Sequence, residues 1–271
     1  MTRPSRLDRE LVDRGLARSR TQAQDLISSG LVQLNGTIAN KPAELVRPSD
    51  HLEAEPDRYV SRAAHKLLGA LDDLSVRVDG RALDAGASTG GFTQVLLERG
   101  CQVVYAVDVG SDQFADSLRD DPRVVLWERT NLRELELRHV GGRPVDLVVA
   151  DVSFISLVLL IERLAAVVSP AGQLLLMVKP QFEVGRELLG KGGVVRSPAL
   201  HRQAVMSVIE AAERTGWFAT GLAPSRLKGP AGNSEFFVLF GSTRPDIAPE
   251  LDALPSPQRD DRHPPGLCCG R

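Results

Sequence analysis

The chain has 271 residues, of which 42% are apolar and 25% are charged, and its formal net charge is −2. This composition is normal for a globular protein with room for one large and one small domain. Because the net charge is close to zero, any binding of nucleic acid requires a local basic surface. No apolar segment is long enough to cross a bilayer, and the three cysteines form neither a disulfide framework nor a zinc spacing. We therefore expect a reduced, cytoplasmic protein without a metal and without stable membrane association.

The first 54 residues predict a small α+β module. Leu7, Leu11 and Val12 share one face of a short helix, and Ser19 is placed to cap a second helix over residues 20–29. An alternating strand then leads into the dipeptide Asn-Gly, which is the strongest short signal for a β-hairpin. Two small helices followed by a hairpin make a compact unit.

The charge of this module is uneven, because residues 1–20 contain six arginines and three acidic residues. Scattered arginines usually indicate a solvated helical face. However, the stretches Arg-Leu-Asp, Gly-Leu-Ala-Arg-Ser-Arg and Gly-Leu-Val-Gln-Leu-Asn-Gly together resemble the S4 RNA-binding domain. The resemblance implies that basic side chains on the two helices and just after the hairpin bind structured RNA. These side chains are Arg3, Arg6, Arg18, Arg20 and Lys41.

Residues 55–60 are expected to form a linker, and residues 61–241 a second domain in which strands and helices alternate. Strands made of Val, Leu and Ile with little polar alternation predict a parallel sheet that is buried on both faces. The last two strands lack a helical crossover, so we expect them to pair antiparallel at one edge. The fold class is therefore α/β, with the outline of a class I (Rossmann-like) methyltransferase sheet. The expected strands are 82–86, 103–107, 123–127, 145–150, 172–178, 217–223 and 235–240, and the expected helices are 91–99, 111–118, 155–168 and 198–215.

Residues 242–271 hold six prolines and little apolar content, so we expect a disordered tail. The neighbouring Cys268 and Cys269 lack partner ligands in sequence and are interpreted as incidental.

A glycine-rich turn follows the first strand of the second domain, in Asp-Ala-Gly-Ala-Ser-Thr-Gly-Gly-Phe-Thr. No Lys-Ser or Lys-Thr follows the glycines, which excludes a phosphate-gripping P-loop. An acidic residue before the turn suits a cationic nucleoside that carries an amino acid, and S-adenosylmethionine is the commonest such ligand. An ordinary tight strand-to-helix turn is the alternative. The candidate cofactor-binding residues here are Asp84, Gly86, Ala87, Ser88, Gly90, Gly91 and Phe92.

Polar residues at the ends of the later strands extend this candidate site, because ligands of open α/β sheets lie beyond the carboxyl ends of the strands. Asp108 stands where an acidic residue binds ribose hydroxyls, and Asn131 is placed to bond an adenine edge. Asp151 ends the fourth strand and Lys179 the fifth. Lys179 either extends into solvent or lies in a partly dry cleft, where burial favours the neutral amine and makes it a candidate base.

Four residues carry a second resemblance. Lys66, Asp151, Lys179 and Glu235, in Ala-His-Lys-Leu, Ala-Asp-Val-Ser-Phe, Val-Lys-Pro-Gln-Phe-Glu and Asn-Ser-Glu-Phe-Phe, are similar to the tetrad of FtsJ-type ribose 2′-O-methyltransferases. With the S4-like module in front, the chain resembles the TlyA family, which is also labelled haemolysin A, over residues 3–241.

The resemblance implies S-adenosylmethionine-dependent 2′-O-methylation of cytidine in ribosomal RNA, in the large subunit and for longer members also in the small one. Ribosomal RNA or ribosomal subunits would be the partner. Lys179 would be the general base, oriented and tuned by Asp151 and Lys66, with Glu235 completing the network. Asp151 would also border the cofactor. A membrane-lytic haemolysin, a non-catalytic RNA-binding protein and a base methyltransferase stay open as alternatives.

Overall fold

The computed structural model describes residues 4–245 of the chain. The predictions for Arg3, for Cys268 and Cys269, and for all but the first four residues of the C-terminal tail fall outside that range.

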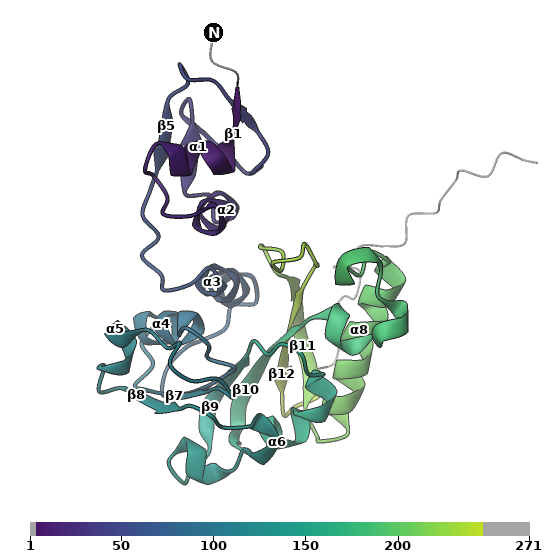
Figure 1. The fold of residues 1–271 in the computed structure, drawn as a ribbon. Helices are drawn as coiled ribbons and strands as arrows, with labels where there is room; N and C mark the ends of the chain where they lie inside the picture. Colours follow the sequence, from purple (N-terminus) through teal and green to yellow (C-terminus); the bar gives the residue numbers. More distant parts are fainter. Residues whose placement is uncertain (1–3, 246–271) are drawn as a thin grey trace, which may run out of the picture.

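The N-terminal module packs two helices against short strands (Figure 1). The side chain of Ser19 accepts a hydrogen bond of 3.2 Å from the backbone N–H of Gln22, so it caps the second helix as predicted. Asn35 and Gly36 have φ values of 51° and 79°, which is the geometry of a two-residue hairpin turn. The elements are β1 (Ser5–Arg6), α1 (Leu7–Asp13), α2 (Arg20–Ser28), β2 (Val32–Leu34), β3 (Thr37–Ile38), β4 (Leu45–Val46) and β5 (Leu52–Ala54).

A seven-stranded sheet forms the centre of the second module, with the strand order β11-β12-β10-β9-β6-β7-β8. Neighbouring strands from β8 to β10 are parallel, whereas β12 runs antiparallel to both β10 and β11. The predicted antiparallel pair at one edge is therefore confirmed. The strands are β6 (Arg81–Ala85), β7 (Val103–Val107), β8 (Val124–Trp127), β9 (Val145–Ala150), β10 (Val168–Val178), β11 (Phe218–Pro224) and β12 (Phe236–Gly241).

Helices cover both faces of this sheet (Figure 1), so its central strands are buried on both sides. Leu67 of α3 and Leu96 of α4 pack on one face, and Leu164 of α6 and Val208 of α8 pack on the other. The α-helices are α3 (Ala63–Asp73), α4 (Gly91–Glu98), α5 (Asp116–Arg119), α6 (Ile161–Ala165), α7 (Pro180–Glu183) and α8 (Pro198–Glu213). The 3₁₀ helices are η1 (Leu132–Glu134), η2 (Leu137–Val140), η3 (Leu157–Leu159), η4 (Arg186–Leu188) and η5 (Lys191–Gly193).

Two predicted helices are wrong in part. Of residues 111–118, only those of α5 are helical, because the preceding segment folds back on the Asp108 carboxylate and Asp112 takes a φ of 61°. The helix predicted over 155–168 is divided into η3 and α6, and Val168 already begins β10. The Glu183 carboxylate accepts from the backbone N–H of Leu157 at 2.8 Å, so the helical residues begin at Leu157 and not at Ile155.

The sequence predicted that no apolar segment is long enough to cross a bilayer. Within residues 4–245, no helix combines the length and the apolar character needed to span a bilayer.

Candidate active site

Two cavities lie at the carboxyl ends of β6 and β9, where strand order reverses and open α/β sheets bind their ligands. The larger has a volume of about 580 Å³ and the smaller about 240 Å³. A volume of 580 Å³ is ordinary for a site that holds a nucleoside-sized ligand. Four residues line both cavities and so mark the place where they meet: Gly86, Ser88, Asp151 and Ser153.

The glycine turn lets the backbone of β6 approach that of β9. Gly86 has φ +87°, and a Cβ at this position would lie 2.7 Å from the carbonyl oxygen of Asp151. A Cβ on Gly90, at φ +95°, would lie 2.6 Å from a methyl carbon of Leu118. Only glycine satisfies both the dihedral angle and the space at these positions. Ala87, Gly91 and Phe92 line the smaller cavity.

The structure places Asp84 behind the turn, where it lines neither cavity; the same holds for Gly90. Asp84 is fully buried and accepts a hydrogen bond of 2.7 Å from the Thr93 hydroxyl, while its Oδ1 has no hydrogen-bond partner within residues 4–245. Burial raises the pKa of this carboxyl to about 7, and the nearby Asp151 carboxylate adds to the shift.

This raised pKa predicts a pH-dependent stability. Since the folded pKa lies above the ordinary value of 3.8, the folded state binds the proton more tightly than the unfolded chain. The contribution of Asp84 to stability is therefore complete below pH 4 and is lost as the pH rises toward 7. Between pH 5.5 and pH 8 the loss amounts to about 2 kcal/mol.

We expect Asp84→Asn to gain stability relative to the wild type over that interval, as measured by urea unfolding at both pH values. Asp79→Asn, which changes an exposed carboxylate, is the matched control. If the wild type and Asp84→Asn lose stability in parallel from pH 5.5 to pH 8, Asp84 does not titrate in that range.

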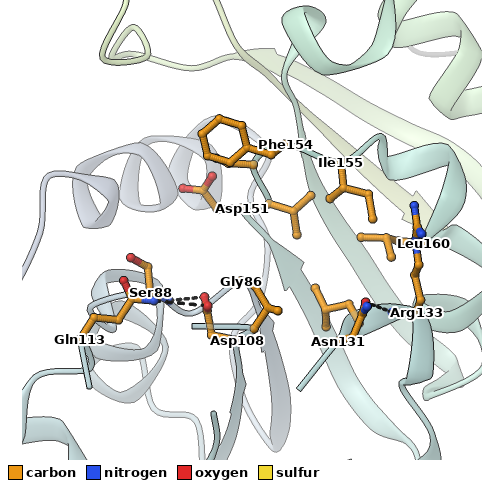
Figure 2. A pocket seen from close by; sticks show the side chains of 14 residues that line it. Gly86, Ser88, Asp108, Gln113, Asn131, Arg133, Asp151, Phe154, Ile155 and Leu160 are labelled. Atoms are coloured by element: carbon orange, nitrogen blue, oxygen red, sulfur yellow. Dashed lines mark hydrogen bonds between the residues drawn. The ribbon is translucent and has the colours of Figure 1, made fainter. Parts of the chain in front are cut away.

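Asp108 and Asn131 both line the larger cavity (Figure 2). The Asp108 carboxylate accepts from the backbone N–H of Ser88 at 2.8 Å and of Gly110 at 2.7 Å, so it ties the glycine turn to the loop after β7. Asn131 accepts from the backbone N–H of Arg133 at 3.0 Å and begins η1. Both side chains therefore line the cavity, and their hydrogen bonds also hold the loops that form its walls.

The four tetrad residues form two buried pairs of opposite charge. Lys66 Nζ, on α3, lies 2.5 Å from Glu235 Oε2, just before β12. Lys179 Nζ, after β10, lies 2.6 Å from Asp151 Oδ1, after β9. Lys66, Lys179 and Asp151 line the smaller cavity. The structure thus brings together side chains that are up to 169 positions apart in sequence.

The predicted RNA-binding arginines are organised by a residue that the sequence analysis missed. Asp8 is fully buried and binds both Arg6, at 3.0 Å, and Arg20, at 2.8 Å. The Arg6 guanidinium holds the pKa of the Asp8 carboxyl well below its usual range. Arg18 and Lys41 are exposed. Asp8 therefore fixes two of the arginines on one surface of the module, which the local pattern of charges did not reveal.

Three further residues near the cavities were also missed. Ser153 lines both cavities, and Phe154, which is 92% exposed, lines the larger one (Figure 2). Glu183, in the Lys-Pro-Gln-Phe-Glu segment, bonds the loop that carries them, through the Ser156 hydroxyl at 2.5 Å. The only signal in the sequence is position, since Ser153 and Phe154 follow directly on a strand end and Glu183 follows the next one.

Comparisons with known proteins agree with this architecture. A model of the FtsJ-like methyltransferase family matches residues 59–242, and a model of the S4 domain matches residues 5–52. The chain is 51% identical over 242 residues to the 16S/23S rRNA (cytidine-2′-O)-methyltransferase TlyA of Mycobacterium tuberculosis, covering 88% of this chain and 90% of that protein. It is 34% identical to Hemolysin A of Brachyspira hyodysenteriae, covering 87% and 99%.

Solved structures give the same result. A structure from Streptococcus thermophilus described as a hemolysin has a TM-score of 0.69 at 36% identity and covers 93% of both chains. With the FtsJ-like model matching well over half of the chain and the relatives spanning most of it, the chain belongs to the TlyA family of FtsJ-like methyltransferases, in which an S4 domain precedes the methyltransferase domain.

Proposed function

We propose that the chain transfers the methyl group of S-adenosylmethionine to the ribose 2′-hydroxyl of cytidine in ribosomal RNA. The observation that carries this proposal is the convergence of two lysine–carboxylate pairs at the smaller cavity: both lysines line it, and Asp151 borders the larger cavity as well. Large-subunit RNA is the first expected substrate. The relative from Mycobacterium tuberculosis is named for both 16S and 23S rRNA, so the small subunit is the second.

The larger cavity fits the cofactor. It offers a carboxylate for ribose hydroxyls, Asp108, and an amide for the adenine edge, Asn131, on walls whose backbone Gly86 brings close together. When bound, S-adenosylmethionine supplies an electrophilic methyl group on a sulfonium, whose sulfur leaves without needing an acid. Ser88, Asp151 and Ser153 border both cavities, so they would lie between the bound cofactor and a substrate in the smaller cavity.

The reacting sugar belongs in the smaller cavity. A ribose hydroxyl is a weak nucleophile at neutral pH, so the protein has to hold it in line with the methyl group and accept its proton. Lys179 lines this cavity and accepts that proton at Nζ, with Asp151 2.6 Å away. Lys66, paired with Glu235, places a second buried amine in the same lining. General-base catalysis of this kind contributes about 10²- to 10⁴-fold to a rate.

The test is incubation of the purified chain with ribosomal subunits and labelled S-adenosylmethionine, followed by nuclease digestion and mass analysis of the nucleosides. We expect 2′-O-methylcytidine. A methyl group found on a base, or cofactor binding with no transfer to any subunit, would contradict the proposal. The second outcome would support a non-catalytic RNA-binding protein instead.

Membrane lysis is the competing function suggested by the name of the Brachyspira hyodysenteriae relative. Leakage of lipid vesicles caused equally by the wild type and by Lys179→Ala would favour it. Methyl transfer that depends on Lys179, without leakage, would favour the enzyme.

RNA binding is expected to depend on the exposed basic residues of the N-terminal module. Replacing both Arg18 and Lys41 by alanine removes two positive charges, so we expect about a 10-fold loss of affinity for ribosomal subunits and a shallower dependence on salt. Filter binding at several salt concentrations measures both, and cofactor affinity should stay unchanged. Arg77→Ala, at an 87% exposed arginine, is the control. Equal losses in the control and the double variant would show that the module provides no specific contact.

A further inference from the structure

Two contacts of different kinds hold the Lys179 amine. Asp151 Oδ1 lies 2.6 Å from Nζ, yet this buried oxygen has no partner of hydrogen-bond geometry within residues 4–245. Nζ does donate a hydrogen bond of 2.8 Å to Ser153 Oγ. A charge–charge attraction depends on distance, whereas a hydrogen bond also depends on direction. Asp151 therefore supplies charge, and Ser153 sets the direction of the amine.

The direction matters because of what surrounds the nitrogen. Besides its bond to Cε, a neutral lysine amine has two hydrogens and one lone pair. One hydrogen is committed to Ser153, and the negative Asp151 carboxylate repels the lone pair, so the lone pair is left the position that faces away from Asp151. All three residues line the smaller cavity, and Asp151 and Ser153 also line the larger one. The lone pair is thus held at the place where a sugar hydroxyl has to meet the methyl group.

The loop that presents Ser153 is held at both of its ends. On one side, the carbonyl of Asp151 packs against Gly86 so closely that no Cβ fits there. On the other side, Glu183 accepts hydrogen bonds from the Ser156 hydroxyl at 2.5 Å and from the Leu157 N–H at 2.8 Å.

Between these anchors Phe154 has a φ of 65°, a conformation that costs a non-glycine residue about 1–3 kcal/mol and persists only when its surroundings enforce it. The strain therefore lies directly beside Ser153, in a loop whose two ends cannot shift freely.

We propose that Ser153 is a positioning residue for the methyl transfer, whose hydroxyl orients the Lys179 amine so that its lone pair faces the ribose hydroxyl. This inference rests on the proposed function. It differs from the roles of the tetrad because Ser153 carries no charge and takes up no proton from the substrate.

The test combines kinetics with a measurement that needs no activity. Ser153→Ala, Ser153→Thr and the wild type are compared for kcat and KM with ribosomal subunits. The same proteins are labelled with carbon-13 at the lysine Cε. The chain has only five lysines, and Lys179→Arg identifies the signal of Lys179. Ser197→Ala is the matched control, because Ser197 is exposed and its side chain makes no capping hydrogen bond with α8.

In Ser153→Ala we expect kcat to fall about 10-fold, the loss expected for one hydrogen bond between neutral groups, with both KM values within about threefold of the wild type. Ser153→Thr keeps a hydroxyl and should recover most of the rate. The two Cε protons of Lys179 should give separate signals in the wild type, because the hydrogen bond to Ser153 holds the end of the side chain in one conformation, and a single averaged signal in Ser153→Ala.

An unchanged kcat, or separate Cε proton signals that persist in Ser153→Ala, would overturn the inference. Equal losses of cofactor binding and thermal stability, without recovery in Ser153→Thr, would assign Ser153 a structural role only and overturn it as well. If the wild type itself forms no ribose-methylated product, the proposed function is wrong, and the lysine signals alone then decide whether Ser153 orients Lys179.

Discussion

Lys179→Ala is expected to lower the rate of methyl transfer about 10³-fold while cofactor affinity stays within about threefold of the wild type. Lys179 lines the smaller cavity but not the larger one, so its removal affects the reacting sugar hydroxyl and not the bound nucleoside. Single-turnover transfer to ribosomal subunits measures the first quantity, and equilibrium dialysis of labelled S-adenosylmethionine measures the second.

Lys179→Arg is the sharper variant for this prediction. A guanidinium keeps the positive charge beside Asp151 but does not give up its proton under these conditions. It should therefore be as inactive as alanine if Lys179 accepts a proton. An arginine variant that turns over at the wild-type rate would show that only the charge is needed, and a fully active Lys179→Ala would exclude any part for this residue in the chemistry.

The second large effect concerns the other buried pair. Lys66→Ala leaves the Glu235 carboxylate, which is 2% exposed, without the ammonium that lies 2.5 Å away. Breaking a buried ion pair from one side costs about 3–5 kcal/mol, because a charge remains in a poorly solvated place. Urea unfolding should show a loss of this size in Lys66→Ala, together with loss of methyl transfer.

The double variant Lys66→Met, Glu235→Leu separates the two effects. Replacing a whole buried pair by apolar side chains of similar volume is often neutral for stability. We expect the double variant to recover most of the stability of the wild type and to stay inactive, because the amine next to the sugar is missing. If activity returned along with stability, the pair would be a structural feature and not part of the reaction.

Local sequence patterns predicted the parts of the fold that depend on neighbours in the chain. The Ser19 cap and the Asn35-Gly36 turn are decided within four residues, and the structure contains both. The strands were located to within a residue or two, except that β10 begins at Val168 and not at 172. The reason is that β6 and β9 are buried on both faces, so their apolar runs stand out from the polar turns on either side.

Contacts with carboxylates outside the predicted helices account for part of what was wrong. The Asp108 carboxylate captures the backbone of the following loop, and this leaves too few residues for a helix over 111–118. Glu183, 26 positions further along the chain, accepts from the backbone N–H of Leu157, so the helical residues begin there and not at Ile155. The helical periodicity of a segment gives no information about hydrogen bonds between its backbone and a carboxylate outside the segment.

In the candidate site, too, some features were predicted from the sequence and others became known only from the structure. Asp108, Asp151 and Lys179 were predicted from their places at the carboxyl ends of buried strands. Lys66 and Glu235 were predicted from the resemblance to the FtsJ-type tetrad, since neither follows a strand end. The separation of the tetrad into two pairs, Lys66 with Glu235 and Lys179 with Asp151, was not evident, and neither was the contact of Ser153 with Lys179. Which lysine pairs with which carboxylate depends on which strands and helices lie next to each other in the fold.

The sequence by itself determined the two-module organisation, the α/β class and the four charged residues that we propose for the reaction. These follow from the period of apolar residues, from turn chemistry and from motifs that are each contained in a short stretch. Only the tertiary structure decided that Asp84 lies behind the turn, that Asp8 gathers two arginines, and that Ser153 touches the Lys179 amine. Each of these depends on burial and on distances across the folded chain, which arise when the sheet forms and brings together residues that no local pattern connects.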